Sequence, residues 1–398
     1  MRTVHNTMCI ILCSILLGTS CKTQRLENDQ VSIPPDTAYS ILYIGTYTEK
    51  EAHVEGKATG IYVYKLDMAT GTLSYVSTSP ETTNPSYIQV HPHGQWLYAV
   101  NETGSDQGEP SGTVSAFRLT KGGTVLEFIN TVPSAGNYPC YIQIDHTGRF
   151  AMVANYGSGT VLLLPLKADG SLGNTVSIDR HTGRGPSARQ EAAHAHMIEV
   201  SPDNKFAYSC DLGTDKIYCY QLDTENGKLV AAGDPYTTQP GSGPRHLAFH
   251  PVKNFVYVVN ELNGTIECMT ADTLTGGLSR FQIISTLAQG DGRTAGCADI
   301  HISPSGKFLY ASNRGTYNNI AMFSITTNTG ALTLIGHQDV KGKTPRNFVI
   351  DPTGTYLLVA NQDSDNVITF RIDPETGKLI DTGIEARIPT PVCLKFLK

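Results

Sequence analysis

The sequence carries little charge and has no excess of basic residues. Charged residues make up 17% of its 398 residues, and the formal net charge is −6. Nucleic-acid binding depends on clustered Lys and Arg, so this composition gives no support for a nucleic-acid partner. Beyond the N-terminal segment, no apolar run approaches the eighteen or more residues of a membrane-spanning helix. The composition therefore argues against a DNA-binding protein and an integral membrane protein.

Two motifs with known chemistry are also missing. No Cys-x-x-Cys pair occurs, so a zinc site is not supported. The motif Gly-x-Ser-x-Gly is also absent, so a serine nucleophile is not supported. Cys210 and Cys219 flank a predicted hairpin turn and could form a disulfide in an oxidising compartment. The alternative is that the cysteines of the folded part are buried free thiols: Cys140, Cys210, Cys219, Cys268, Cys297 and Cys393.

The N-terminus contains a short apolar run of the kind found in export signals. Met8–Leu17 is too short to span a bilayer and is followed by small residues and Cys21. This arrangement resembles a bacterial lipoprotein signal, and simple secretion is the alternative. We therefore predict a signal peptide over residues 1–20, lipidation of Cys21, and a polar tether over 21–37. The predicted location is periplasmic or membrane-anchored, with membrane contact only through this lipid anchor.

The residues that are abundant point to an all-β protein built from repeats. Glycine (38) and tyrosine (19) are frequent, while Trp96 is the one tryptophan. A turn such as His250-Pro251 or Ser303-Pro304-Ser305-Gly306 recurs, each time followed by an aromatic-rich apolar strand that ends in Asn or Asp. The steps between these strand ends are 48 to 56 residues, which suits a propeller blade. The strand ends are Asn101, Asn155, Asp211, Asn260, Asn313 and Asn361.

Each repeat continues into a second hairpin, so the pattern predicts four antiparallel strands per blade. Ile41–Tyr47 looks like the second strand of a further blade that lacks its innermost strand. Pro391–Leu397 is a strand with no partner after it. Pairing the two closes the ring and removes two sheet edges. We therefore predict one domain over residues 38–398, an all-β, seven-bladed β-propeller closed by its N- and C-terminal strands.

The repeat register places two sets of residues on one rim of the propeller axis. Polar and charged members cluster on consecutive blades, and several arginines near one axis suggest a site for an anion. The set that opens the innermost strands is Ser86, Cys140, His196, Arg245, Ala298 and Arg346. The set that follows the second strands is Glu102, Tyr156, Leu212, Glu261, Arg314 and Gln362.

Each of these features also has an ordinary structural explanation. A rim arginine is usually solvated, and Glu261 could simply neutralise Arg245. The repeated Asn tolerates left-handed backbone and caps turns. His194 and His196 could form a metal pair, although no third ligand has a comparable claim. The polar loop Asp179–Ala193 enters the rim beside His196 and is either a lid or a surface loop.

Motifs from several blades together resemble a known family. They are His-Ala-His before SPD, DLGTDKI, GSGPRHLAFHP, VVNEL, ADIHISPSGKFLYASNRG and PRNFVIDPTGTYLLVANQ, and the resemblance covers about Ile41 to Leu397. They are similar to the seven-bladed lactonases, which include the propeller-type 6-phosphogluconolactonase and the carboxymuconate-lactonizing enzyme. The resemblance implies hydrolysis of a sugar-derived lactone without a metal or organic cofactor. It carries the family's functional residues over to His196, Arg245, Glu261 and Arg314.

These residues allow a division of roles. We expect His196 to act as general base, with Glu261 as its orienting group or as acid, while Arg245 and Arg314 hold the substrate anion and the developing oxyanion. The partner is then a small-molecule lactone, with no obligate protein partner. Further substrate contacts are predicted at Arg346, His194, Arg189, Gln190, Glu102, Asp299 and Gln362.

Two alternatives remain open from the sequence. A non-catalytic envelope propeller could use the same arginines to bind an anionic glycan fragment or a protein. The same residues could also run the lactonizing direction on a carboxymuconate. An export signal favours an unphosphorylated aldonolactone or uronic lactone over a phosphorylated one.

Overall fold

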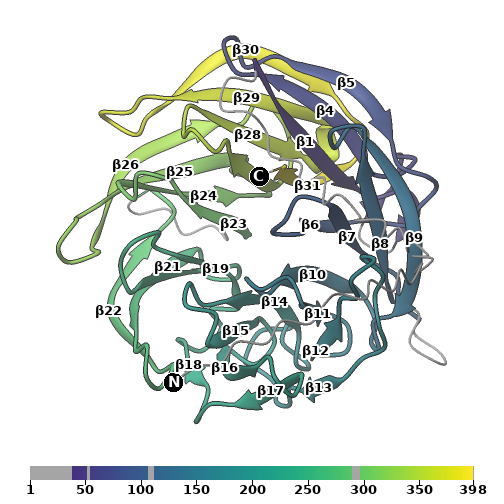
Figure 1. Cartoon of the computed structure of the whole chain (residues 1–398). Helices are drawn as coiled ribbons and strands as arrows, with labels where there is room; N and C mark the ends of the chain where they lie inside the picture. Colours follow the sequence, from purple (N-terminus) through teal and green to yellow (C-terminus); the bar gives the residue numbers. More distant parts are fainter. Residues whose placement is uncertain (1–37, 52–53, 106–111, 289–295, 398) are drawn as a thin grey trace, which may run out of the picture. The chain divides into compact units, whose positions relative to one another are not determined.

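The computed structural model describes residues 38–51, 54–105, 112–288 and 296–397, which belong to one compact unit, Val31–Lys398. These residues form seven antiparallel sheets, each with a main path of four strands, arranged as propeller blades around an axis (Figure 1). The predicted signal peptide, Cys21 and the tether lie outside the described residues. No helix in the described ranges is long and apolar enough to cross a membrane.

The strands follow the predicted order from the axis outwards. The innermost strands are β31 (Pro391–Phe396), β6 (Tyr87–Val90), β10 (Pro139–Ile144), β14 (Ala195–Val200), β19 (Pro244–Phe249), β23 (Cys297–Ile302) and β27 (Pro345–Ile350). The second strands are β1 (Tyr39–Thr46), β7 (Trp96–Asn101), β11 (Phe150–Asn155), β15 (Phe206–Asp211), β20 (Phe255–Asn260), β24 (Phe308–Asn313) and β28 (Tyr356–Asn361).

The outer half of each blade is the second predicted hairpin. The third strands are β4 (Tyr62–Asp67), β8 (Thr113–Thr120), β12 (Thr160–Pro165), β16 (Lys216–Asp223), β21 (Thr265–Ala271), β25 (Asn319–Ile325) and β29 (Asn366–Ile372). The outermost are β5 (Leu73–Thr78), β9 (Val125–Pro133), β13 (Ser177–Arg180), β17 (Lys228–Ala231), β22 (Leu278–Ser285), β26 (Leu332–Asp339) and β30 (Leu379–Arg387). Smaller elements are β2 (Lys50–Glu51), β3 (Val54–Glu55), β18 (Tyr236–Thr237) and the 3-10 turn η1 (Gln362–Ser364).

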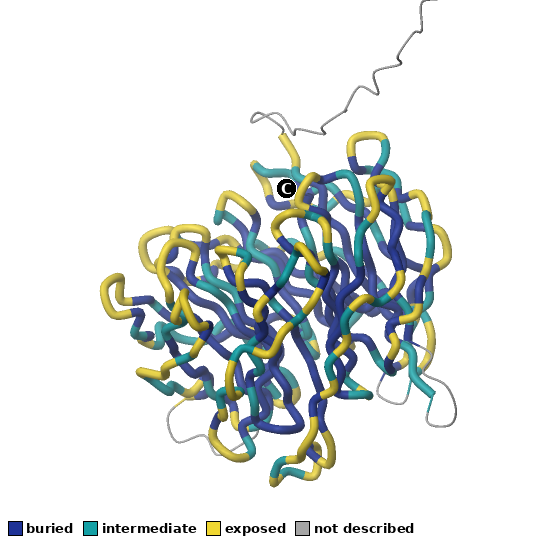
Figure 2. Tube along the Cα trace, turned by 60° about the horizontal axis from the view of Figure 1, so that its bottom comes forward, coloured by how far each residue is buried: buried dark blue, intermediate teal, exposed yellow. Residues whose placement is uncertain are grey.

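The core lies between the blades, where the two inner strands of each sheet are covered on both faces. All six residues of β24 and of β28 are buried, for example. Figure 2 shows this as dark blue strands through the middle of the propeller, with exposed turns in yellow at its ends. Strands buried on both faces need continuous apolar sequence, which explains runs such as YLLVAN without polar alternation.

The tyrosines of the second strands join neighbouring blades. Each hydroxyl reaches the outer turn of the next blade and donates a hydrogen bond of 2.7–3.0 Å to a backbone carbonyl. The pairs are Tyr43–Gly123, Tyr98–Gly170, Tyr208–Gly276, Tyr257–Gly330, Tyr310–Gly377 and Tyr356–Ala69. The repeated aromatic position is therefore both core and a blade-to-blade link, because a buried tyrosine hydroxyl requires a partner.

The repeated Asn or Asp at the end of the second strand is structural. The predicted turn capping occurs at Asp211, whose Oδ1 accepts from the Thr214 N–H at 2.9 Å, but the predicted left-handed backbone does not. None of the six repeated Asn and Asp residues has a positive φ. In four of the six repeats the side-chain amide donates to a carbonyl of the connection that enters the blade, as Asn155 does to Ser134 at 2.9 Å and Asn101 to Thr83 at 2.7 Å. The Asn thus fixes the segment that leads into the innermost strand.

The two ends of the described chain close the ring as predicted. β31 pairs antiparallel with β1, with Leu42 opposite Phe396 and Ile44 opposite Leu394. Gly45 allows this approach, since a Cβ there would lie 2.6 Å from the Pro85 carbonyl oxygen and 3.2 Å from the Cβ of Cys393. The closed ring leaves the last inner strand paired instead of exposed at an edge.

The cysteines of the folded part are free thiols. Cys210 lies opposite Ile217 and Cys219 opposite Tyr208 in the hairpin of β15 and β16. The two cysteines are therefore not cross-strand partners, and the disulfide alternative considered for them is wrong.

Candidate active site

The innermost strands of five neighbouring blades begin with an irregular register. In β10, β14, β19 and β27 one residue is left unpaired between two partners of the second strand, and in β23 two are. A bulge of this kind bends the strand and re-aims side chains, and it is common next to active sites. The unpaired residues are Cys140, His196, Arg245, Ala298, Asp299 and Arg346. Apart from Asp299, they are residues that the repeat register places around the rim.

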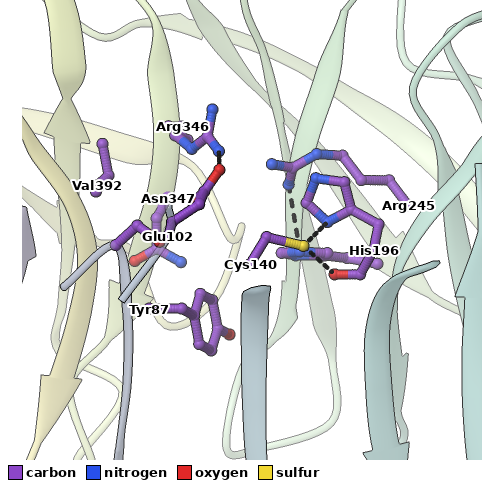
Figure 3. A pocket seen from close by; sticks show the side chains of 10 residues that line it. Tyr87, Glu102, Cys140, His196, Arg245, Arg346, Asn347 and Val392 are labelled. Atoms are coloured by element: carbon purple, nitrogen blue, oxygen red, sulfur yellow. Dashed lines mark hydrogen bonds and ion pairs between the residues drawn. The ribbon is translucent and has the colours of Figure 1, made fainter. Parts of the chain in front are cut away.

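A small cavity opens at this end of the axis. It contains about 260 Å³ of empty space, part of it open to solvent. Its lining brings together residues from separate blades that the sequence predicts on one rim: Ser86, Glu102, Cys140, His196, Arg245 and Arg346. Figure 3 shows Arg346 with Glu102 on one side and Arg245 with His196 and Cys140 on the other.

Glu261 is the buried centre of an arginine cluster beside this cavity. Its Oε2 lies 2.9 Å from Nη2 of Arg314 and 3.0 Å from Nε of Arg245, the latter an ion pair without hydrogen-bond alignment. Its Oε1 accepts a 2.5 Å hydrogen bond from Nη1 of Arg189. Burial opposes the charge of Glu261, but Arg314 and Arg245 outweigh it and lower its pKa to about 2. Glu261 is therefore an ionised anchor for three cations at neutral pH.

Arg245 stays cationic although it is buried. Burial and the neighbouring Arg314 lower its pKa to about 10, while Glu261 supports the charged form. Its Nη1 also donates a 2.5 Å hydrogen bond to the carbonyl of Ala298, the rim residue of the next blade. The guanidinium is thus held between two blades at the edge of the cavity.

Arg346 lies across the cavity in a looser ion pair. Its Nη2 is 3.7 Å from Oε1 of Glu102, and its guanidinium lies over the ring of Tyr47 at 5.4 Å from the ring centre. A pair at this distance is weaker than the short contacts around Glu261. A carboxylate therefore holds Arg346 less tightly than Glu261 holds Arg245 and Arg314.

His196 is buried in the cavity wall. Its Nδ1 lies 3.8 Å from the Sγ of Cys140, and its ring packs edge-on against Tyr156. Burial and the charge of Arg245 hold the pKa of His196 well below its usual value. The imidazole is therefore neutral at neutral pH.

The loop before β14 reaches into the arginine cluster. Arg189 contacts Glu261 and donates to the hydroxyl of Tyr156 at 3.1 Å. The loop is fixed at its start by His181, whose Nδ1 lies 2.7 Å from Asp211, and near its end by Gln190. The loop begins after Arg180 and not at Asp179, because the outer strand β13 extends to Arg180.

Five predicted substrate contacts do not line the cavity: Arg189, Gln190, His194, Asp299 and Gln362. The amide nitrogen of Gln190 donates to Asp215 at 2.7 Å, and that of Gln362 donates to Asp363 at 2.9 Å. His194 lies 3.0 Å from the Tyr156 carbonyl through Nδ1 and 3.1 Å from Glu191 through Nε2.

The rings of His194 and His196 have separate partners. Within the described ranges, no group of three or more His, Cys, Asp or Glu residues is arranged to hold a metal ion.

The cavity also includes a histidine that the sequence register misses. His246 follows Arg245 and lines the same cavity, and its Nδ1 lies 2.8 Å from Oδ1 of the buried Asp299. A regular strand would turn neighbouring residues to opposite faces. The bulge removes that alternation, so both Arg245 and His246 reach the cavity. From the sequence, a register shift of one residue would place His246 on the axis in place of Arg245, whereas the bulge brings both residues to the cavity.

The fold and this cavity define a seven-bladed propeller with a charged pocket at one end of its axis. The chain belongs to the family described as "Lactonase, 7-bladed beta-propeller", whose model matches residues 41–396. The resemblance predicted from the sequence is confirmed.

Among its relatives are 6-phosphogluconolactonases from Bacillus subtilis, 34% identical over 89% of this chain and 97% of the relative, and from Formosa agariphila, 36% identical over 85% and 94%. A solved periplasmic gluconolactonase from Pseudomonas aeruginosa superimposes with a TM-score of 0.84 at 33% identity, covering 90% of this chain and 99% of that one.

Proposed function

We propose that the protein hydrolyses a sugar-derived lactone by general acid–base catalysis in the arginine-rich axial cavity, using its own side chains. The observation that carries this proposal is that a neutral imidazole and an anchored arginine, His196 and Arg245, line one cavity. Arg314 is held beside Arg245 through Glu261. Relatives named 6-phosphogluconolactonase and a structural neighbour named gluconolactonase support the same chemistry.

Ester hydrolysis needs a base for water and positive charge for the oxyanion. A neutral imidazole on the cavity accepts the proton of the attacking water. Arg245 and Arg314 are the cations closest to the developing oxyanion in this proposal. Glu261 is ionised down to low pH, so its role is to position the arginines and not to donate a proton.

Arg346 supplies the second anion contact of the proposal. Its longer ion pair with Glu102 leaves the guanidinium able to bind a substrate phosphate, carboxylate or hydroxyl group. A phosphorylated lactone gains more from this arginine than a plain one, because a phosphate presents a full charge and several acceptor oxygens.

A pH-stat assay of the folded unit from Val31 tests the proposal. Turnover of 6-phosphogluconolactone or glucono-δ-lactone above the uncatalysed rate is expected. Arg346→Gln should raise KM about tenfold or more for the phosphorylated substrate, the equivalent of one charge-assisted hydrogen bond, and less for the plain one. Tight binding of sugar acids without turnover of any lactone would instead support a binding protein.

We further propose that the protein is exported. The apolar run Met8–Leu17 and Cys21 carry this proposal, and the structural neighbour from Pseudomonas aeruginosa, a periplasmic gluconolactonase, agrees with it. Labelling of the wild-type chain but not of Cys21→Ser with a fatty-acid probe is expected; equal labelling would contradict the anchor.

A further inference from the structure

His246 and Asp299 form a buried pair behind the cavity. Nδ1 of His246 lies 2.8 Å from Oδ1 of Asp299, and both side chains are almost fully buried, at 4% and 3% exposure. The two residues come from the bulged starts of neighbouring inner strands, β19 and β23. The cavity is lined by His246 but not by Asp299, so the histidine stands between the cavity and the carboxylate.

Asp299 is a rigid, fully occupied acceptor. Besides His246, its Oδ1 accepts from the backbone N–H of Ile300 at 3.0 Å. Its Oδ2 lies 3.0 Å from Nε2 of His301 and accepts from the side-chain amide of Asn347 at 2.5 Å. These contacts outweigh burial and hold the pKa of Asp299 well below its usual value. The carboxylate is therefore charged and fixed in orientation.

Two independent partners assign the same tautomer to His246. An ionised carboxylate can only accept, so Nδ1 must carry the proton that is donated to Asp299. On the other side of the ring, Nε2 lies 3.3 Å from Nη1 of Arg245. A guanidinium has no acceptor, so Nε2 must be the nitrogen with the lone pair. That contact is long, and the same Nη1 makes its shorter bond to Ala298.

His196 lacks such an arrangement. Its ring is 5.3 Å from that of His246 on the same cavity, yet its Nδ1 faces the thiol of Cys140 at 3.8 Å. No carboxylate in the described ranges contacts its ring. A general base is effective when a third group holds its tautomer and stabilises the imidazolium that forms, and among these two histidines His246 has that group.

We propose that His246 is the catalytic base of the lactonase and that Asp299 is its positioning residue. This inference rests on the proposed function. The water oxygen forms a bond to the lactone carbonyl carbon while its proton passes to Nε2 of His246. The carbonyl electron pair moves to the oxygen beside the arginines. When the tetrahedral intermediate collapses, the ring C–O bond breaks and the leaving alkoxide takes the proton from Nε2. Lactone and water thus give the hydroxy acid.

The groups around His246 determine its protonation. Burial and Arg245 lower its pKa to about 4, while the hydrogen bond to Asp299 raises it. The base is therefore neutral above that pH, and kcat/KM should fall as the pH drops through it. The titratable and charged groups that act on the ring from the surrounding strands are Arg245, Asp299, His196, His301, Tyr87 and Tyr141.

Matched variants of the folded unit test this inference. His246→Gln should lower kcat by about a hundredfold or more, the usual contribution of a general base. Asp299→Asn should lower kcat by at least about tenfold, because an amide favours the wrong tautomer, and should move the acid limb of kcat/KM to lower pH. A purely structural defect would lower activity without moving that limb. His93→Gln, a histidine in an exposed turn, is the control and should match the wild type.

The outcomes separate this inference from the proposed function. Wild-type protein without turnover of any lactone would overturn both. Active wild type together with a His246→Gln variant within about threefold of it would overturn the role of His246 alone. If circular dichroism shows that either variant fails to fold, long-range ¹H–¹⁵N NMR of the wild-type protein is used to determine which ring nitrogen of His246 carries the proton. A proton on Nδ1 of His246 is expected, and a proton on Nε2 would contradict the inference.

Discussion

Glu261 shows how one carboxylate can hold an arginine cluster together. Arg189, Arg245 and Arg314 come from three parts of the chain and would repel one another around an apolar wall. A single ionised carboxylate at their centre offsets this repulsion, and its own burial makes each attraction stronger than it would be in water. The desolvation free energy of these buried charges is offset only while Glu261 is ionised.

This arrangement predicts an acid-dependent loss of stability. The pKa of Glu261 is about 2 in the folded chain against 4.5 for a free side chain. A lowered folded-state pKa stabilises the fold above the unfolded value and loses that contribution as the pH falls towards 2. The difference corresponds to about 3 kcal/mol. Urea unfolding of wild type and Glu261→Gln should therefore differ most at neutral pH and converge between pH 4.5 and 2.

An exposed ion pair supplies the matched control. Glu385 lies 2.9 Å from Arg387 on the surface, where solvent screens the interaction. Glu385→Gln should leave the unfolding free energy nearly unchanged across the same pH range. A constant difference between wild type and Glu261→Gln at every pH would show that the carboxylate charge is not what stabilises the cluster.

At the scale of elements, the loop between β13 and β14 adds one side chain to a site otherwise built by the inner strands and by the residues that directly follow the second strands. His181 and Gln190 tie the two ends of the loop to β15 and the turn after it through Asp211 and Asp215. Arg189 is left to extend over Glu261 and Tyr156. Half of the Arg189 side chain stays exposed, at 53%, whereas Glu261 beneath it is 4% exposed. The loop thus covers one side of the arginine cluster.

Removing the Arg189 side chain should weaken substrate binding more than it slows the chemical step. Arg189→Ala takes away one of three cations from Glu261 but leaves the imidazoles in place. KM for the lactone should rise about tenfold, with kcat within about threefold of wild type. Arg184→Ala, an exposed arginine of the same loop, is the control and should match the wild type. Equal effects of the two variants would mean that the loop contributes only bulk charge.

At the scale of the whole propeller, ring closure depends on one short strand. β31 contributes Val392, Cys393, Leu394 and Phe396 to the buried interior and pairs with β1. Tyr356 of β28 adds a link between the preceding blade and this composite blade through the Ala69 carbonyl. Without β31, the inner edges of β1 and the neighbouring inner strands would be open to solvent.

Deletion of β31 should therefore lower the melting temperature by at least about 10 °C, because several buried apolar side chains are lost together. A circular permutant supplies the control. In this permutant the chain is opened between β30 and β31, and the end of β31 is joined to the start of β1 by a short hairpin loop. A short loop suffices because the two ends are adjacent: the Leu397 N–H donates a 2.9 Å hydrogen bond to the Ile41 carbonyl. The permutant should melt near the wild type. A permutant as unstable as the deletion would show that connectivity, and not the strand pairing, stabilises the ring.

The sequence by itself determined the architecture, because repeated turns, buried strand runs and the unpaired terminal strands recur at a period that only a closed ring of blades satisfies. It also brought His196, Arg245, Glu261 and Arg314 to one rim, since two positions in each repeat, the start of the innermost strand and the end of the second strand, lie at the same end of the axis. The tertiary structure alone decided how those residues divide their contacts. Glu261 is saturated by arginines, and His246 joins the cavity through a bulge. Bulges and ion-pair geometry arise from packing between blades, and a repeat count carries no information about them.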